Sequence, residues 1–471
     1  MKVVQLYTGC LAEAAYYIES NGEAAIIDPL RETKPYLELA AQNGAKIKFV
    51  LETHFHADFV SGHLDLAKKA GATIVFGPTA VPNFKAHVAT DGELLQIGKV
   101  TIQVLHTPGH TLESSSFLLK DDQGKDYAIF TGDTLFIGDV GRPDLAVKSD
   151  LSREDLAGML FDSLRNKIMP LADAVIVYPG HGAGSACGKK MSRETESTIG
   201  QQKQLNYALR ANMTREEFVR EVLTGLVEPP QYFPKNAVLN KMGYESIDEV
   251  LDRGVRALNA PRFVQLWREN EALVLDTRTK AAFMEAHIPE AIYIGLDGQF
   301  ASWVGTLVPD LKQPILLLTD PGREQEAVTR LARVGYDHTI GYLQGGMAAW
   351  EATGEQVGKI NSITAEEFAD RLTRSSSVNV LDVRRHSEFE AEHVDGAQNF
   401  PLDFINRHLH ELDPREVYLV HCQSGYRSVI AISILKNYGY TRLLNVEGGI
   451  QAIKATGRVP MTDFVEQMTE L

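Results

Sequence analysis

The carboxyl-terminal half of this 471-residue chain contains an internal repeat, which restricts how that half can fold. The segment Leu275-Asp276-Thr277-Arg278 recurs as Leu381-Asp382-Val383-Arg384, 106 residues later. The pairs Phe283 and Phe389, His287 and His393, and Leu296 and Leu402 keep the same separation. The separation falls to 103 at Gly345-Gly346 and Gly448-Gly449, so one copy is slightly shorter. Strand-like and helix-like patterns alternate in each copy, which predicts two small α/β domains.

The first 235 residues or so behave as a separate unit. Short runs rich in β-branched and aromatic residues are divided by turns, and helical patterns lie between them. The predicted strands include Met1–Tyr7, Ala24–Ile27, Lys48–Leu51, Thr73–Phe76, Val100–Leu105, Tyr127–Phe130 and Ala174–Tyr178. We therefore expect sheets covered by helices. The predicted organisation is a first domain over residues 1–235, a helical connector over 236–258, and repeat copies over 259–358 and 359–471.

Composition limits the partners and the compartment. The formal net charge of −15 argues against nucleic acid or an anionic membrane as a partner. No apolar run approaches the roughly 18 residues that span a bilayer, and the N-terminus reads as a strand and not as a signal peptide. Three scattered cysteines, Cys10, Cys187 and Cys422, make a disulfide framework implausible. We expect a cytoplasmic protein; its oligomeric state is left open, with a homo-oligomer as one option.

Four segments that follow strand-like runs carry metal-ligand residues. The first is Thr53-His54-Phe55-His56-Ala57-Asp58-Phe59, and the others hold His110, Asp133 and His181. This arrangement resembles the metallo-β-lactamase superfamily over roughly residues 1–235, which implies an αββα sandwich. The superfamily motif ends in a histidine that serves a second metal, and Phe59 stands there instead. Asp58 and His181 alone would hold a second cation poorly, so we expect one metal.

Within that superfamily the chain is most similar to the persulfide dioxygenases. The resemblance implies one Fe(II) per chain held by His54, His110 and Asp133, a ligand set that favours iron and oxygen chemistry. His56, Asp58 and His181 would then orient the ligands and water. The implied reaction converts a persulfide, O2 and water to a thiol and sulfite.

The segment Gly141-Arg142-Pro143-Asp144 looks like the substrate-binding Gly-Arg segment of these dioxygenases. Arg142, Tyr178 and Cys187 are the candidate substrate-binding residues, and the glycine-rich loop with two lysines predicts a lowered pKa for the Cys187 thiol. The aromatic segment that glutathione-persulfide dioxygenases carry after His181 is replaced by Gly182-Ala183-Gly184-Ser185-Ala186. The thiol carrier therefore stays open among glutathione, coenzyme A, cysteine, bacillithiol and inorganic polysulfide.

The second repeat copy contains a strand, Val417–His421, followed by Cys422-Gln423-Ser424-Gly425-Tyr426-Arg427-Ser428 and a helical run. This resembles the rhodanese active-site loop, in which backbone N–H groups and a helix dipole stabilise a thiolate or persulfide. Cys422 and Arg427 are its predicted catalytic residues. The first copy has Thr319-Asp320-Pro321-Gly322-Arg323 at the corresponding point, in a loop that reads as two residues shorter, and it lacks the cysteine. This copy therefore resembles an inactive rhodanese domain with a degenerate loop.

The pattern as a whole predicts a persulfide dioxygenase–sulfurtransferase fusion whose partners are small persulfides, O2, sulfite and thiosulfate. The alternative is a thioester hydrolase of the glyoxalase II type, which needs two metals. A non-catalytic alternative makes the rhodanese pair a sulfur-carrier or docking module.

Overall fold

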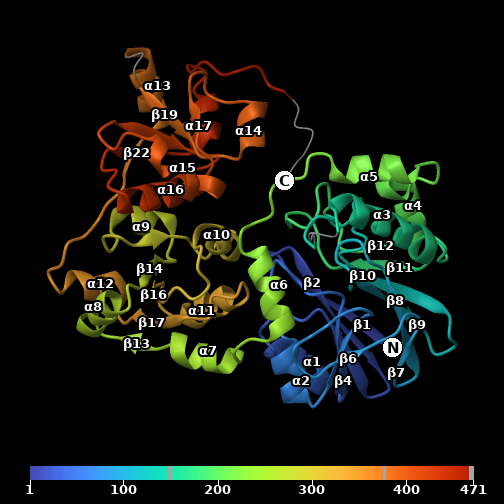
Figure 1. Ribbon diagram of the computed structural model, residues 1–471. Coiled ribbons are helices and arrows are strands. Elements are labelled where there is room, and N and C mark those ends of the chain that lie inside the picture. Colours follow the sequence, from blue (N-terminus) through green and yellow to red (C-terminus); the bar gives the residue numbers. More distant parts are fainter. Residues whose placement is uncertain (147–150, 375–377, 466–471) are drawn as a thin grey trace. The chain divides into compact units, whose positions relative to one another are not determined.

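The structure is a computed structural model, and it describes residues 1–146, 151–374 and 378–465 (Figure 1). The chain forms two compact units. The first contains Met1–Asp248 together with Ala332–Gly335, and the second contains Glu249–Leu331 and the described residues after 335. Among the described residues, no helix is both long and apolar enough to cross a membrane.

Two six-stranded sheets form the centre of the first unit. In one sheet the strands lie in chain order: β1 (Lys2–Thr8), β2 (Glu13–Ser20), β3 (Glu23–Ile27), β4 (Lys46–Glu52), β5 (Thr73–Phe76) and β6 (His87–Val88). The other sheet has the order β12 (Ser197–Thr198), β11 (Ile176–Pro179), β10 (Asp126–Gly132), β9 (Ser115–Lys120), β8 (Val100–His106) and β7 (Leu94–Ile97).

Helices cover the outer faces of both sheets. Helices α1 (Lys34–Gln42) and α2 (His63–Ala70) share an apolar core with the first sheet. Helices α3 (Arg153–Ser163), α4 (Ile199–Leu205) and α5 (Arg215–Leu223) share one with the second sheet. A third core lies between the two sheets, and α6 (Phe233–Met242) follows. The layers run helix, sheet, sheet, helix, which confirms the predicted αββα sandwich.

Strand β2 explains how one sheet serves two cores. Successive side chains of a strand point to opposite faces. Ala14, Tyr16 and Ile18 therefore join the core between the sheets, while Ala15 and Tyr17 join the core beneath α1 and α2. Because both faces are covered, β2 is an almost continuous apolar run and lacks the alternation of a half-exposed strand.

The second unit contains two five-stranded parallel sheets with the same strand order. The first has the order β13 (Ala257–Leu258), β17 (Thr339–Leu343), β16 (Ile315–Leu318), β14 (Leu273–Asp276) and β15 (Ile292–Tyr293). The second has the order β18 (Asn361–Ile363), β22 (Leu443–Val446), β21 (Tyr418–His421), β19 (Asn379–Asp382) and β20 (Gln398–Asn399). The identical order agrees with the internal repeat.

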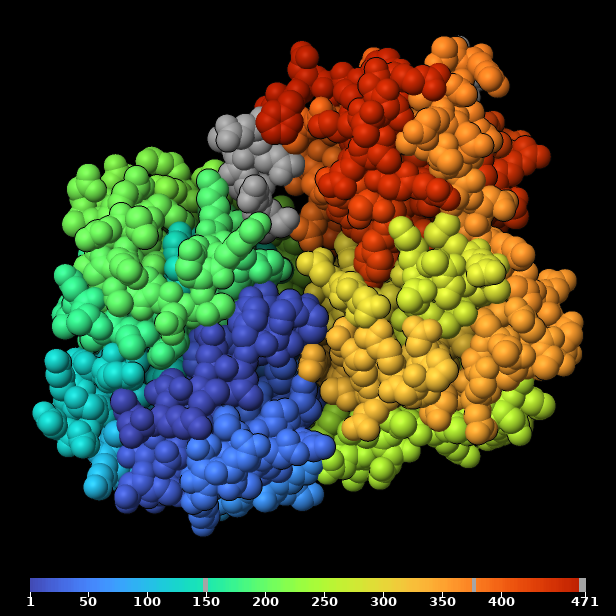
Figure 2. Space-filling view, turned by 180° about the vertical axis from the view of Figure 1, so that it is seen from behind, coloured from blue at the N-terminus to red at the C-terminus, as the bar shows by residue number. Residues whose placement is uncertain are grey.

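Helices complete each copy. Those of the first copy are α8 (Ala260–Glu269), α9 (Lys280–Glu285), α10 (Phe300–Leu307), α11 (Glu324–Ala332) and α12 (Gly346–Glu351). Those of the second are α13 (Ala365–Arg374), α14 (His386–Ala391), α15 (Ile405–His408), α16 (Tyr426–Asn437) and α17 (Gly449–Ala455). The surfaces of the two copies, yellow to red, meet without a break in Figure 2.

The predicted connector contains more than helices. Helix α7 (Ile247–Gly254) lies within it, but Ala257 and Leu258 form β13, which pairs with β17 in parallel. The first repeat sheet therefore begins inside the segment 236–258. A two-residue strand gives a weak periodic signal, and the pairing partner that reveals it lies more than 80 residues away.

Candidate metal centre and sulfur-transfer loop

The metal-ligand residues of the first unit follow strands of both sheets. His54 comes after β4 of one sheet, while His110, Asp133 and His181 come after β8, β10 and β11 of the other. Gly132 brings two of these segments together: its backbone has a φ of +49°, and a Cβ there would lie 2.5 Å from Thr53 Oγ1. A glycine thus allows the end of β10 to contact the His54 segment.

His54, His110 and Asp133 converge with their ligand atoms unused. Asp133 Oδ2 lies 3.4 Å from His110 Nε2 and 4.0 Å from His54 Nε2. All three atoms are buried, and none has a hydrogen-bond partner among the described residues. Buried polar atoms without partners are costly, so three of them facing one point fit a bound cation.

The hydrogen bonds of His54 and His110 involve Nδ1 of each ring and leave Nε2 available to a metal. His110 Nδ1 donates to the carbonyl oxygen of Arg142 at 2.8 Å. The Thr53 hydroxyl donates to Asp28 Oδ2, so it accepts from His54 Nδ1 at 3.0 Å. With Nδ1 protonated, Nε2 of each neutral ring is free to bind a metal. Burial also lowers the pKa of His54, which keeps the ring neutral.

His181 is held differently, between two carboxylates. Its Nδ1 lies 2.8 Å from Asp133 Oδ1, and its Nε2 lies 2.7 Å from Asp58 Oδ2. Burial alone would lower the pKa of His181, but Asp133 and Asp58 raise it well above its usual value. His181 thus fixes the orientation of Asp133 through the oxygen that does not face His54 and His110.

His56 belongs to a second buried cluster. Its Nε2 lies 3.1 Å from Asp28 Oδ1 and 3.4 Å from Glu52 Oε2. Glu52 also contacts Ser61 and lies 3.4 Å from His63 Nδ1. The sequence analysis missed Asp28 and Glu52. Their signal is positional: Asp28 directly follows β3 with a φ of +50°, and Glu52 ends β4 two residues before His54.

Phe59 occupies the last position of the histidine motif with an apolar ring. It is fully buried, and its ring centroid lies 4.3 Å from that of His56. It offers no donor to a metal.

Cys187 joins Asp58 and His181 in a third group, in which the ligand atoms lie within 4.8 Å of one another. The protein groups around Cys187 act against the predicted lowering of its pKa: burial, followed by Asp58 and Asp133, raises the pKa of the thiol well above its usual value. Lys189 is one of the two lysines that were expected to lower this pKa. Its Nζ donates instead to the carbonyl oxygens of Glu221 and Thr224. The one-metal argument also counted only Asp58 and His181, whereas Cys187 offers a third donor.

The two other candidate substrate residues contact protein groups. The Arg142 guanidinium, which is buried, donates to both carboxylate oxygens of Asp144 and to the carbonyl oxygens of Ala186 and Val227. The Tyr178 ring stacks on Phe130 with centroids 5.3 Å apart, and burial raises the pKa of its hydroxyl to about 12. Their assignment to substrate stays a prediction.

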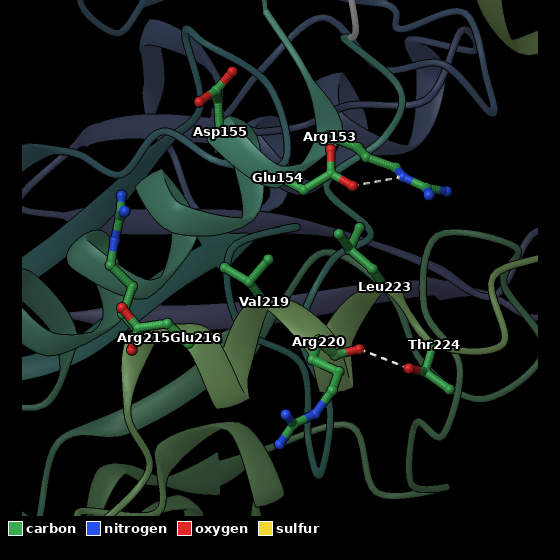
Figure 3. Close-up of a pocket in the computed structure, with 9 residues that line it drawn as sticks. All are labelled: Arg153, Glu154, Asp155, Arg215, Glu216, Val219, Arg220, Leu223 and Thr224. Atoms are coloured by element: carbon green, nitrogen blue, oxygen red, sulfur yellow. Dashed lines mark hydrogen bonds and ion pairs between the residues drawn. The ribbon is translucent and has the colours of Figure 1, made fainter.

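A surface pocket of about 600 Å³ lies between α3 and α5 (Figure 3). Arg153, Glu154, Asp155, Arg215, Glu216, Val219, Arg220, Leu223 and Thr224 line it. None of the predicted site residues does, and Figure 3 shows Arg153 paired with the neighbouring Glu154. The pocket is therefore separate from the metal-ligand residues.

Cys422 lies in the second unit, between β21 and α16. Its buried sulfur accepts a hydrogen bond from the Gly425 N–H at 3.1 Å, and Gly425 has a φ of +96°. Arg427, in the first turn of α16, forms a two-pronged ion pair with Glu388 at 2.5 and 2.8 Å. The loop thus directs a backbone N–H at a sulfur that lies just before the N-terminus of a helix.

The loop of the first copy is not shorter, contrary to the sequence analysis. Five residues, 319–323, separate β16 from α11, whereas four, 422–425, separate β21 from α16. The copies differ in length earlier, between β15 and β16, where α10 stands in place of the shorter α15 and its flanking turns. The absence of a cysteine from residues 319–323 is unchanged.

An αββα sandwich with buried histidine and aspartate ligands at its strand ends defines a metal-dependent enzyme fold. The family comparisons agree: residues 8–181 match the metallo-beta-lactamase superfamily, and residues 260–353 and 364–456 each match the rhodanese-like domain. The chain belongs to the metallo-β-lactamase superfamily and carries two rhodanese-like domains, which confirms the predicted domain architecture.

The individual relatives differ in the activities that their names give. A metallo-beta-lactamase structure from Staphylococcus aureus is 34% identical, with a TM-score of 0.65, over 73% of this chain and 99% of that chain. A probable hydroxyacylglutathione hydrolase of Schizosaccharomyces pombe is 29% identical over 51% of this chain and 97% of that protein. The mitochondrial persulfide dioxygenase of Homo sapiens is also 29% identical, over 42% and 70% respectively.

Proposed function

We propose that the first unit is a mononuclear iron persulfide dioxygenase and that the second is a sulfurtransferase. The substrates would be a thiol persulfide, O2 and water, and the products a thiol and sulfite. The observation that carries the first half is the convergence of His54 Nε2, His110 Nε2 and Asp133 Oδ2, all buried and without a hydrogen-bond partner in the described part of the chain. Two imidazoles and one carboxylate are the ligand set of non-haem iron oxygenases.

The residues of this chain would act as follows. His54, His110 and Asp133 would hold Fe(II), which would supply Lewis acidity and an open position for O2. Thr53 and the Arg142 carbonyl keep the two imidazoles in the ligand tautomer, and His181 orients the Asp133 carboxylate. The presence of Phe59 in place of a histidine supports the proposal of one metal per chain, because a phenylalanine ring supplies no ligand.

The Cys422 loop supports the second half of the proposal. A thiolate there would accept or return a sulfane sulfur atom, and the Gly425 N–H would stabilise the resulting anion. Arg427 adds positive charge at the start of α16, although Glu388 balances it. Sulfite from the first unit and sulfane sulfur on Cys422 together make thiosulfate chemistry available to one chain.

The division of labour can be tested with Cys422→Ser. Because the serine hydroxyl does not form a persulfide, thiosulfate formation and cleavage should fall by at least about a hundredfold. Oxygen uptake with a persulfide should stay within about a factor of two, since the iron ligands are untouched. Cys10→Ser is the matched control and should preserve both activities. Loss of oxygen uptake in Cys422→Ser would contradict the two-site proposal.

One observation favours a second candidate, a two-metal thioester hydrolase of the hydroxyacylglutathione hydrolase type. Asp58, His181 and Cys187 together offer three donors for another cation. Metal analysis of the purified chain, combined with oxygen uptake and thioester hydrolysis assays, separates the two. One iron with oxygen uptake supports the dioxygenase; two metals with hydrolysis and no oxygen uptake support the hydrolase.

A further inference from the structure

The two rhodanese-like copies contact one another at the Cys422 loop. Tyr426, directly after Gly425, donates its hydroxyl hydrogen to the Gly295 carbonyl of the first copy at 3.0 Å. A Cβ at Gly298 would lie 2.5 Å from the Tyr426 ring, so the glycine admits that ring. Further along α16, Ser433 Oγ accepts from the Tyr293 N–H at 3.1 Å. These contacts fix the first copy against the start of α16 (Figure 1).

This contact places a lysine of the first copy beside the loop. Lys280 is the first residue of α9, whose N-cap is Thr279. A Cβ built on Gly425 would lie 3.0 Å from Lys280 Nζ, and that is the nearest atom it would meet. The ammonium therefore stands next to the residue whose N–H binds the Cys422 sulfur.

Charge pairing makes Lys280 different from the cations around it. Arg427 is neutralised by Glu388, and Arg323, in the degenerate loop of the first copy, is paired with Asp297. Asp297 is also the carboxylate that acts electrostatically on Tyr426. Within residues 1–146, 151–374 and 378–465, the Lys280 ammonium has no ion-pair or hydrogen-bond partner, and it is partly exposed.

We propose that Lys280, supplied by the copy that lacks a cysteine, binds the sulfonate end of thiosulfate or sulfite at the mouth of the Cys422 loop. This deepens, and rests on, the sulfurtransferase proposed above. In the reaction, the Cys422 thiolate attacks the outer sulfur of thiosulfate, and a new S–S bond forms. The bond to the sulfonate sulfur breaks, and its electron pair leaves with sulfite. An ammonium at the mouth offsets the repulsion between this anion and the thiolate.

Steady-state kinetics with thiosulfate and cyanide test the proposal. Lys280→Gln should lower kcat/KM for thiosulfate by about tenfold, the loss of one charge-assisted contact. It should leave kcat/KM for cyanide within about twofold, because cyanide has no sulfonate group for Lys280 to bind. Lys280→Arg keeps the charge and should restore most of the loss. Lys312→Gln, an exposed lysine of the same copy, is the control and should change neither value.

A binding measurement separates this proposal from the sulfurtransferase activity itself. Sulfite is titrated calorimetrically into Cys422→Ser and into Cys422→Ser with Lys280→Gln, and the second should bind about tenfold more weakly. Equal sulfite affinity, or an unchanged kcat/KM for thiosulfate in Lys280→Gln, would overturn the role of Lys280. A wild-type chain that cleaves no thiosulfate would instead refute the proposed function, and the titration would still decide whether Lys280 binds the anion.

Discussion

At the scale of single residues, the histidines of the first unit show how neighbours set protonation. His54 and His110 each donate from Nδ1 to an oxygen, which leaves Nε2 as a lone pair. His181 lies between two carboxylates that raise its pKa, so its ring is favoured as the cation. The two histidines proposed as metal ligands and the histidine proposed to position Asp133 therefore differ in the acceptors that surround them.

Phe59→His tests what limits the number of metals. The change restores the last histidine of the motif beside Asp58, so bound metal should rise above the wild-type stoichiometry, as measured by elemental analysis after loading. Without metal, the variant should unfold more easily by about 2–3 kcal/mol, because an imidazole would replace a fully buried apolar ring.

Phe59→Leu is the matched control. It keeps an apolar side chain, should cost about 1–2 kcal/mol of stability, and should leave the metal content unchanged. An unchanged stoichiometry in Phe59→His would mean that something other than the missing donor excludes the second cation.

At the scale of elements, the Glu388–Arg427 pair links α14 to α16. Burial would raise the pKa of Glu388, but the hydrogen bonds and charge of Arg427 lower it below the ordinary value of 4.5. A carboxylate whose pKa is lower in the folded state stabilises the fold above its unfolded pKa. That contribution disappears as the pH falls through the folded pKa.

Glu388→Gln should therefore destabilise the second unit most at neutral pH, by about 1 kcal/mol, since the glutamine removes the charge. The difference from the wild type should shrink as the pH is lowered from 7 towards 3, measured by urea unfolding at each pH. Glu390→Gln, an exposed position on the same helix, serves as the control. A loss of stability that does not change with pH would show that packing, and not charge, explains the effect.

Local pattern predicted the elements well and their contacts poorly. Thr73–Phe76 was predicted as a strand and forms β5 with those bounds, because alternation and flanking turns are encoded locally. The proximity of Cys187 to Asp58 depends on how distant loops pack, and no spacing rule contains it. The predicted length of the loop at 319–323 was wrong, because matching the glycines of the two copies gives their difference in length but not the position of the extra residues.

At the scale of the molecule, the chain consists of two compact units. The repeat in the sequence predicted that the second unit contains two small α/β domains. The repeat did not predict that Lys280 of the first copy would lie beside the Cys422 loop of the second, because a contact between the copies produces no repeated pattern in the sequence. We expect a ligand that binds one unit to change the stability of that unit alone.

Metal removal is expected to destabilise only the first unit. Calorimetry of the metal-loaded chain should show two transitions, and a chelator should lower only one of them. At a metal concentration about a thousand times Kd, the loss corresponds to about 4 kcal/mol. Glu388→Gln should shift the other transition and thereby assign it to the second unit. A single transition that moves as a whole would contradict independent units.

The double-sided packing of β2 also limits how this chain can change through evolution. Neighbouring residues of that strand belong to opposite cores, so inserting one residue would exchange the two apolar sets and disrupt both layers at once. We therefore expect changes in length to disrupt the fold less after the strands than within them. The segments after the strands also carry the residues proposed to bind the metal, so we expect the chemistry of this fold to change more readily than its layers.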